Sequence, residues 1–439
     1  MAYTETVHQS WGSRLGNSFR GILFGIVLFV VAFPVLFKNE GRAVRRAKAL
    51  DEGAGAVVSV DASAALPENV GRLVHFSGPA STPSILRDAL FGVETNAFAL
   101  VRRVEAYQWE ENEKTTEKKN LGGSVDRTTE YTYRKGWGDR PVDSSDFKEP
   151  EGHANPQVWA VEPAESFATD VKVGAFLLPD GEADGLGRAV PAALPPVSAP
   201  LPADAPRGLF RVPQGLYYSA ALAAAPVSPA PVPAPAPAPE APVGTNAVAE
   251  AAATNAPAEP PAVAAAPAPT IPAEPSIGDL RVTLEVRPLG TVSVVARQAG
   301  SAFEPSVEAY RTSNGGSVFL IANGRRTAEE MFESARQANR FLTWLLRLVG
   351  FLLMLFGLRA VLDPLATLGD VVPLLGRIVG AGAGFVAGVL ALALSAATIG
   401  VAWLFYRPLL GVPLLVAAVA LVVWLARRRP AAAPAAQGG

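Results

Sequence analysis

The sequence predicts an α+β membrane protein with four transmembrane helices, one N-terminal and three C-terminal, and a large β-rich extramembrane domain between the first and the second. Two observations support this. Residues 21–37 read GILFGIVLFVVAFPVLF, and comparably apolar runs return only from Phe341 onwards, whereas a helix needs about 20 apolar residues to cross a bilayer core. Hydrophobic residues form 49% of the 439 and mean hydropathy is +0.23, high for a soluble protein and modest for a membrane bundle alone.

The first transmembrane helix is expected over residues 18–37, after a short cytoplasmic N-terminus over residues 1–17. A cleaved signal peptide is the alternative. The apolar run exceeds the usual 7–15 residues of a signal core, and no small-x-small cleavage site follows it. A polar stop, KNEGRAVRR, begins at Lys38. These features favour a retained anchor.

The extracytoplasmic β-rich domain is expected in two parts, residues 38–223 and 276–326, separated by an Ala/Pro-rich spacer over residues 224–275. The core of the spacer reads PVSPAPVPAPAPAPEAP. Proline lacks an amide donor and has a fixed φ, so this proline-rich linker should be extended and polyproline-II-like. It is either a tolerated surface insertion or a track for a proline-recognising partner.

Short runs rich in β-forming residues flank the spacer, and several alternate with the period of two that is typical of half-buried strands. Because three short strands alone bury little apolar surface, the runs after the spacer should complete the sheet begun before it. The polar run Glu110–Lys119 is expected to be a solvated hairpin tip. The predicted strands are Ala56–Val60, Arg72–Phe76, Ala97–Trp109, Thr128–Trp137, Val171–Leu178, Val282–Val286, Thr291–Arg297 and Ser317–Ile321.

The C-terminal part is predicted to be helical. Thr327 and Glu330 form a capping box, which opens one helix over residues 327–361 that leaves the domain and becomes the second span. The third and fourth spans are expected over residues 378–405 and 409–426, followed by a disordered cytoplasmic tail over residues 427–439. The connection PLATLGDVVPLLGR is apolar but contains prolines, so we expect an interfacial or re-entrant turn there.

Glycines recur every four residues in the third span and twice in the first. Small residues at this spacing allow two membrane helices to approach closely, so these glycines are assigned to helix packing, within one chain or between copies in a homo-oligomer. Chance glycines in an alanine-rich helix are the alternative. The assigned residues are Gly21, Gly25, Gly376, Gly380, Gly384 and Gly388.

Ionisable groups are nearly absent from the predicted spans. Arg347 is the one expected inside a span, about two turns from its start and within snorkelling distance of the interface. Without a chain of buried charges, a proton-coupled pump is not expected, and a transporter would need a polar path that the spans do not supply.

Composition and motifs predict no catalytic, cofactor-binding or metal-binding residues. The net charge of −2 gives no reason to expect nucleic-acid binding, and the absence of cysteine excludes disulfides and thiolate chemistry. The alternative function is a membrane-bound hydrolase using Ser145 and His153, but no G-x-S-x-G motif is present and the segment around them is typical of a hydrogen-bonded loop. A zinc site would need His75 and His153 to converge with carboxylates.

A series of blocks runs in order along the chain: WGSRLGNSFRGILFGIVLF, LFKNEGRAV, GRLVHFSGPAST, FGVETNAFALVRRVEAYQWEE, TYRKGW, DSSDFKEPEGHANP, GAFLL, EEMFESA, LTWLLRLVGFLLMLFGL and AWLFYRPLLGVPLL. Together these blocks closely resemble the transmembrane-protein-43 (LUMA) family. The resemblance implies four spans, a lumenal large loop, cytoplasmic ends and no established enzymatic activity. In animals the family is associated with the inner nuclear membrane and endoplasmic reticulum, with lamin and emerin partners.

Location and partners are expected from these features together. Three arginines at residues 427–429 favour a cytoplasmic C-terminus, while the basic residues after the first span oppose that orientation; the family resemblance favours a domain outside. The Ala/Pro-rich, cysteine-free composition looks bacterial, so we expect the bacterial cytoplasmic membrane with a periplasmic domain. The expected function is a membrane-organising scaffold. Its expected partners are the lipid bilayer, an unknown protein bound by the domain and a second copy of the chain.

Overall fold

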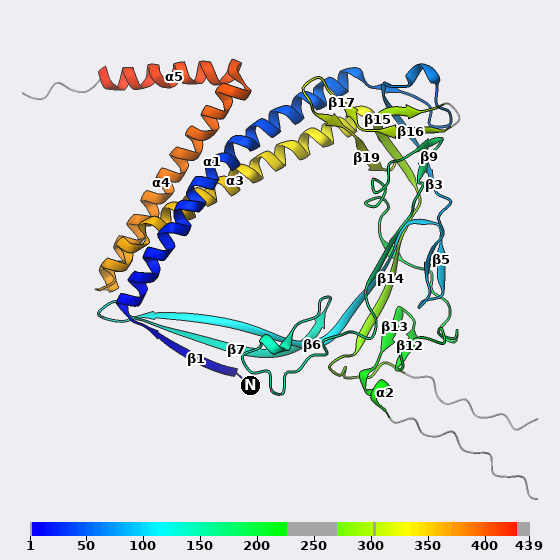
Figure 1. Ribbon diagram of the computed structural model, residues 1–439, viewed down its shortest axis with the longest axis horizontal. Coiled ribbons are helices and arrows are strands. Elements are labelled where there is room, and N and C mark those ends of the chain that lie inside the picture. The colour runs from blue at the N-terminus through cyan, green and yellow to red at the C-terminus, as the bar shows by residue number, and fades with distance from the viewer. Residues whose placement is uncertain (1, 226–269, 302–303, 372, 428–439) are drawn as a thin grey trace, which may run out of the picture.

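The computed structural model describes residues 2–225, 270–301, 304–371 and 373–427. Most of the predicted spacer and the tail beyond residue 427 lie outside the described residues. The described chain forms an open frame (Figure 1). Long helices make one side, a β-ribbon makes the second, and the remaining sheets make the third.

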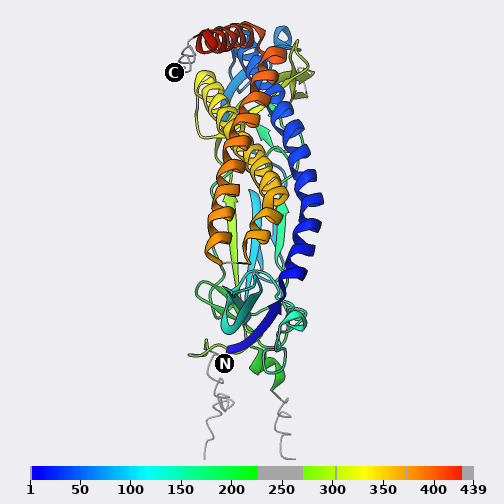
Figure 2. The same cartoon turned by 90° about the vertical axis from the view of Figure 1, so that its left-hand side faces the viewer.

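The helical side consists of α1 (Trp11–Ala56), α3 (Ala328–Gly369) and α4 (Pro373–Tyr406), followed by α5 (Pro408–Arg427). Helices α1 and α3 pack antiparallel over most of their length, and α4 lies against both (Figure 2). A short helix, α2 (Ala220–Ala224), precedes the spacer. Within the described residues, three helices are long and apolar enough to cross a membrane: α1, α3 and the part of α4 from Ile378. The apolar stretch described in α5, Pro408–Ala417, is shorter than a span, so a fourth transmembrane helix stays a prediction.

The capping box is confirmed at the start of α3. Thr327 Oγ1 accepts a hydrogen bond from the amide of Glu330, whose carboxylate accepts one from the amide of Thr327. A single helix therefore leaves the domain, as expected, but it continues to Gly369 through the buried Pro364. Proline removes one helical hydrogen bond and does not end a helix whose neighbouring turns are packed. Most of the connection PLATLGDVVPLLGR is helical, because α3 continues to Gly369 and α4 begins at Pro373, with a turn at residues 370 and 371. The described residues of this stretch do not form a re-entrant loop, and an interfacial turn there stays a prediction.

The larger sheet has eight strands, and its main path runs β1-β7-β6-β14-β13-β12, with β8 paired to β6 and β11 paired to β14. Strand β14 pairs antiparallel with β6, so the chain after the spacer completes the sheet begun before it, as predicted. The strands are β1 (Ala2–Gln9), β7 (Val125–Gly138), β6 (Ala97–Lys119), β14 (Leu280–Pro288), β13 (Gly215–Tyr218), β12 (Leu209–Val212), β8 (Ala164–Phe167) and β11 (Val190–Pro191).

The second sheet has seven strands in the order β19-β15-β16-β10-β9-β3-β2, with β15 also paired to β3. Phe76 of β3 and Phe176 of β10 stack in its core, with ring centroids 4.3 Å apart. The strands are β2 (Val58–Ser59), β3 (Leu73–Ser81), β9 (Lys172–Val173), β10 (Phe176–Leu177), β15 (Thr291–Gly300), β16 (Pro305–Glu308) and β19 (Leu320–Asn323), beside two small pairs, β4 (Leu86–Asp88) with β5 (Val93–Thr95) and β17 (Tyr310–Arg311) with β18 (Ser317–Val318).

The ribbon of β6 and β7 corrects one prediction. Glu110–Lys119 is not a hairpin tip but the outer half of β6, paired with β7 down to Lys119↔Val125. Arg134 pairs with Glu110 and Arg127 with Glu117 across the two strands, so the mixed charges satisfy one another within the ribbon. The tip is a turn over residues 120–124, where Gly122 and Gly123 have φ of +88° and +81°.

The C-terminal part of α1 and the first turns of α3 form one end of the helix pair, and this end packs in a hydrophobic cluster with the second sheet. Leu50 of α1 and Phe332 of α3 are almost fully buried there, in one cluster with Leu73 and Val295 of the second sheet and with Val318 of β18. Burying an apolar side chain of this size contributes about 1.5–3 kcal/mol. This cluster therefore fixes the pose of α1 and α3 on the β structure.

The N-terminal strand extends the larger sheet. Strand β1 pairs antiparallel with β7 over eight residues, from Ala2↔Thr132 to Gln9↔Val125. The pairing places residues 2–9 beside the outer half of the ribbon of β6 and β7, whose sequence EENEKTTEKK is too polar for hydrocarbon. The expectation that residues 1–17 lie on the cytoplasmic side and residues 38–223 outside stays a prediction.

A disulfide crosslink tests the pairing, and the cysteine-free chain gives a clean background. Thr6 and Thr128 lie opposite each other, with hydroxyls 3.2 Å apart. We expect Thr6→Cys with Thr128→Cys to crosslink within one chain in oxidised native membranes, seen as a shifted monomer band on a non-reducing gel. The control pair, Thr6→Cys with Thr132→Cys, is four residues out of register and should not crosslink. Labelling of the two introduced cysteines of the first pair from opposite faces by an impermeant reagent would contradict the pairing.

Candidate functional site

Two polar clusters flank the apolar middle of the α1–α3 pair, and they are the best candidates for functional sites. The first cluster joins three helices. Glu40 of α1 is fully buried, and Arg347 of α3 binds it in a two-pronged contact, with Nε 2.6 Å from Oε1 and Nη2 3.0 Å from Oε2. The indole Nε1 of Trp403 in α4 donates to Oε2 at 2.9 Å. A planar guanidinium matches a carboxylate in this geometry.

Sequence reasoning missed Glu40 because it falls in the polar stop after the apolar run. Arg347 was expected to extend towards the interface, whereas it is paired inside the bundle. An unpaired charge among apolar helices is costly, so Arg347 required an acidic partner. Glu40, the first carboxylate after the first span, was the candidate that this argument could have found. Polar contacts continue the cluster along α1 and α3: Arg42 donates to the side chain of Asn339, and Asn339 donates to the carbonyl of Ala43, each at 3.0 Å.

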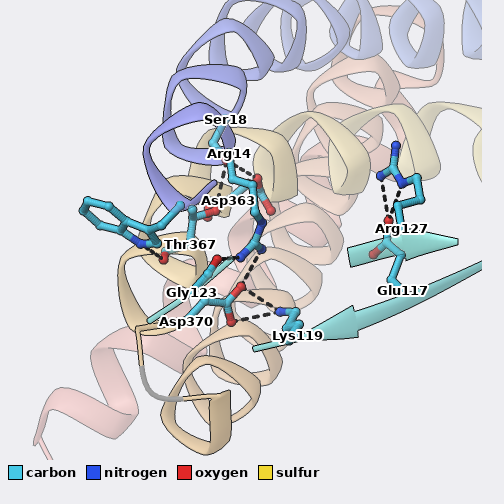
Figure 3. Close-up of polar contacts among 10 residues, drawn as sticks. Arg14, Ser18, Glu117, Lys119, Gly123, Arg127, Asp363, Thr367 and Asp370 are labelled. Atoms are coloured by element: carbon cyan, nitrogen blue, oxygen red, sulfur yellow. Dashed lines mark hydrogen bonds and ion pairs between the residues drawn. The ribbon is translucent and has the colours of Figure 1, made fainter. Parts of the chain in front are cut away.

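The second cluster, the hairpin clamp, fastens the ribbon tip to the opposite end of the helix pair (Figure 3). It consists of Arg14 of α1, Lys119 of β6 and Asp370 at the end of α3. Asp370 Oδ2 lies 2.6 Å from Arg14 Nη2, and Lys119 Nζ lies 2.8 and 2.7 Å from the two carboxylate oxygens. Arg14 also donates to the carbonyl of Gly123 in the tip. The Asp370 side chain is only 2% exposed, so this contact is shielded from solvent.

Backbone contacts tighten the same junction. The amide of Gly122 donates to the carbonyl of Val371 at 3.1 Å, and the indole of Trp11 donates to the carbonyl of Thr367 at 2.9 Å. A Cβ at Gly123 would overlap the Trp11 ring, so only glycine fits there, also because of its positive φ. Burial raises the pKa of Asp370, but the hydrogen bonds and charges of Lys119 and Arg14 outweigh this effect and hold that pKa below its usual value.

The predicted packing glycines lie in different surroundings. A Cβ on Gly25 would stand 2.7 Å from the carbonyl oxygen of Gly357 in α3, so α1 and α3 cross in near backbone contact there. Gly357 was missed because the other glycine of the second span, Gly350, lies seven residues before it, so no repeat of four marks it. Built Cβ atoms would meet Ala366 at 3.6 Å from Gly380 and Arg359 at 3.5 Å from Gly384.

Two of the other three glycines show no such contact. Gly21 and Gly388 have nothing within 4 Å of a built Cβ. Gly376 lies in the part of α4 whose side-chain surroundings are not described. The packing assignment of the glycine set as a whole stays a prediction.

The alternative hydrolase pair is not assembled. Ser145 Oγ donates to Asp143 at 2.7 Å, and His153 Nδ1 lies 2.8 Å from the carbonyl of Glu149. The imidazole stacks on Tyr133 at 3.9 Å between ring centroids and meets Trp109 edge-on. Among the described residues no hydrogen bond joins Ser145 to His153, and the contacts are those of a folded loop.

The zinc alternative also finds no cluster in the described part of the chain. His75 lies in the second sheet, where its Nε2 is 2.8 Å from the carbonyl of Arg326. His75 and His153 therefore belong to different parts of the fold, His75 to a strand of the second sheet and His153 to a loop. Within the described ranges, no group of three His, Asp or Glu side chains could hold a metal ion.

Comparison with known proteins gives one consistent family. The model of the family described as Transmembrane protein 43 matches residues 106–408. Human transmembrane protein 43 is 31% identical over 94% of this chain and 91% of its own length, and the rat protein is 31% identical over 90% and 87%. The Drosophila melanogaster homologue is 30% identical over 97% and 96%. No solved structure matches the chain.

The buried ion pair generates a stability prediction. Glu40→Ala leaves Arg347 without its buried partner, which typically costs about 3–5 kcal/mol. The control Glu333→Ala removes an exposed contact with Arg340 on the same helix and should cost at most about 1 kcal/mol. Thermal unfolding in detergent measures both. Equal, small shifts in the two variants would show that the buried pair adds nothing to stability.

The clamp generates a pH prediction. Because the pKa of Asp370 is lowered in the folded protein, its contribution is fully present above the unfolded value of about 3.9 and is lost as pH falls through the lowered value. Hydrogen exchange, corrected for intrinsic rates, should show residues 119–125 protected at neutral pH and exposed only in strong acid. Asp370→Asn should expose them already at pH 7. Protection that is unchanged in this variant would mean that the charges do not hold the tip.

Proposed function

The chain belongs to the transmembrane protein 43 family, and we propose that it works as a non-enzymatic scaffold that organises a membrane. The observation that carries this proposal is the fastening of one apolar helix pair at both ends to a continuous β structure. The hydrophobic cluster around Leu50 and Phe332 holds one end, and the hairpin clamp holds the other. A helix pair held in this way keeps a fixed angle to the β structure.

The middle of the helical side supports membrane embedding. Leu23 of α1, Phe341 of α3 and Phe385 of α4 are 71%, 71% and 73% exposed. Apolar surface of this extent is normally covered by lipid or by another protein. The chain is an integral membrane protein, and these exposed apolar side chains contrast with Glu40, which is fully buried inside the bundle.

The finer placement is part of the proposal. A cysteine-free, Ala/Pro-rich chain fits the bacterial cytoplasmic membrane, with the large β-rich domain on the periplasmic face. A protein partner of the β structure, a homo-oligomer and α5 as a fourth span belong to the same proposal. No contact described above favours the hydrolase, since Ser145 and His153 each bond elsewhere.

In-cell crosslinking tests the scaffold, with identification of the captured proteins and lipids and a membrane phenotype measured in a deletion strain. A scaffold depends on its shape, so Asp370→Asn with Arg14→Gln should lose captured partners and the phenotype at normal abundance. Ser145→Ala with His153→Ala should retain both. Loss of function in the second variant alone, with normal abundance, would favour the hydrolase over the scaffold.

A further inference from the structure

A cavity of about 920 Å³ lies behind the hairpin clamp, where the ribbon tip meets the ends of α1 and α3 and the first turns of α4. Its size is that of a site for a large organic ligand. One part of its wall is charged and an adjoining part is apolar, and the two meet where Arg359 Nη1 lies 3.5 Å from a Cβ built on Gly384. The residues used below are Arg14, Lys119, Arg127 and Arg359 on the charged wall, and Gly21, Phe356, Gly380 and Gly384 on the apolar wall.

Basic side chains outnumber acidic ones in the lining. Four cations face the cavity with two carboxylates, Asp363 and Asp370. Asp370 forms ion pairs with Arg14 and Lys119 in the hairpin clamp. Asp363 accepts a hydrogen bond from Ser18 at 2.7 Å (Figure 3). Arg359 has no ion-pair or hydrogen-bond partner among the described residues, although it lines the cavity. The cavity therefore offers an unused guanidinium to an anion.

A second arginine stands on the ribbon side. Arg127 of β7 binds Glu117 through Nε and Nη2, at 3.0 and 2.6 Å from the same carboxylate oxygen. Both of these hydrogen bonds go to Oε1 of Glu117, so other N–H groups of the guanidinium can still donate to a ligand. Guanidinium groups bind phosphate oxygens with two parallel hydrogen bonds. Arg127 and Arg359 therefore provide phosphate ligands on two sides of the cavity.

The cavity lies at the boundary between apolar and polar parts of the helices. Arg359 directly follows the apolar run of α3 that begins at Phe341, and Gly21 begins the apolar run of α1. Lipid headgroups occupy this depth in a bilayer, where each basic residue attracts anionic lipid by about 1 kcal/mol. Beside them, Gly380 and Gly384 leave the apolar wall without side chains, and Gly21 has open space around it. Such a wall accommodates an acyl chain.

We propose that this cavity binds an anionic glycerophospholipid, with its phosphate between Arg127 and Arg359 and an acyl chain along the glycine-lined wall of α4. The proposal deepens the scaffold function, and it rests on that function only in placing α1, α3 and α4 in the bilayer. The lipid would join the ribbon tip to the helix ends. A specific lipid at this junction would couple the β structure to the composition of the membrane.

The test uses the full chain in detergent, with native mass spectrometry and thermal unfolding after addition of phosphatidylglycerol, phosphatidylcholine or inorganic phosphate. We expect phosphatidylglycerol to be retained and to raise the melting temperature, and the other two to do neither. Arg359→Gln should lower retention about fivefold, which corresponds to about 1 kcal/mol. Gly380→Leu should lower retention without changing any charge, because the added side chain fills the apolar wall, where a Cβ at Gly380 meets only Ala366 among the described residues.

Two matched controls separate the site from general charge effects. Arg340→Gln changes an arginine at the other end of α3 that pairs with Glu333, and Arg134→Gln changes an arginine of β7 that pairs with Glu110 as Arg127 pairs with Glu117. Both should retain phosphatidylglycerol like the parent. Equal retention of the two lipids, an equal effect of phosphate, or an unchanged Arg359→Gln variant would overturn the proposal. None of these results would alter the crosslinking outcome that tests the scaffold.

Discussion

The antiparallel contact between α1 and α3 is the constraint on which the rest of the structure depends. The two backbones come together at Gly25 and Gly357, where a side chain on either would collide with the other helix. In lipid, helix association relies on such close packing and on polar contacts, because apolar surface gains little by leaving a hydrocarbon solvent. Glu40 and Arg347 supply the polar contact further along the pair, in a geometry that satisfies both charges.

The β-ribbon acts as a brace across the open side of this helix pair. Strand β6 has 23 residues and spans about 78 Å at 3.4 Å per residue, while α1 with 46 residues spans about 69 Å. The two elements are therefore long enough to meet again at the hairpin clamp after diverging at the second sheet. A brace of this length would bend if it were a single strand. Pairing with β7 and β1 makes it a three-stranded ribbon.

The two charged clusters differ in what they do. The cluster of Glu40, Arg347 and Trp403 joins three helices inside the bundle and has no solvent access at Glu40, so it specifies how those helices pack. The hairpin clamp joins helix to sheet beside a cavity that still holds an unused arginine. It is therefore the part of the frame where a ligand from the membrane could stabilise the junction between helices and sheets.

The sequence by itself determined the elements that depend on local pattern. Apolar runs and the capping box of Thr327 and Glu330 identified the long helices, and alternation identified β3, β6, β7, β14 and β15, because these signals come from neighbouring residues. The cost of an unpaired charge required a partner for Arg347 without naming it, whereas the crossing at Gly357 and the pairing of β1 with β7 join residues more than a hundred positions apart, for which local pattern carries no signal. Only the tertiary structure decided them. It also decided that the charged run Glu110–Lys119 is a strand, because its stability there comes from the ion pairs and hydrogen bonds of the opposite strand.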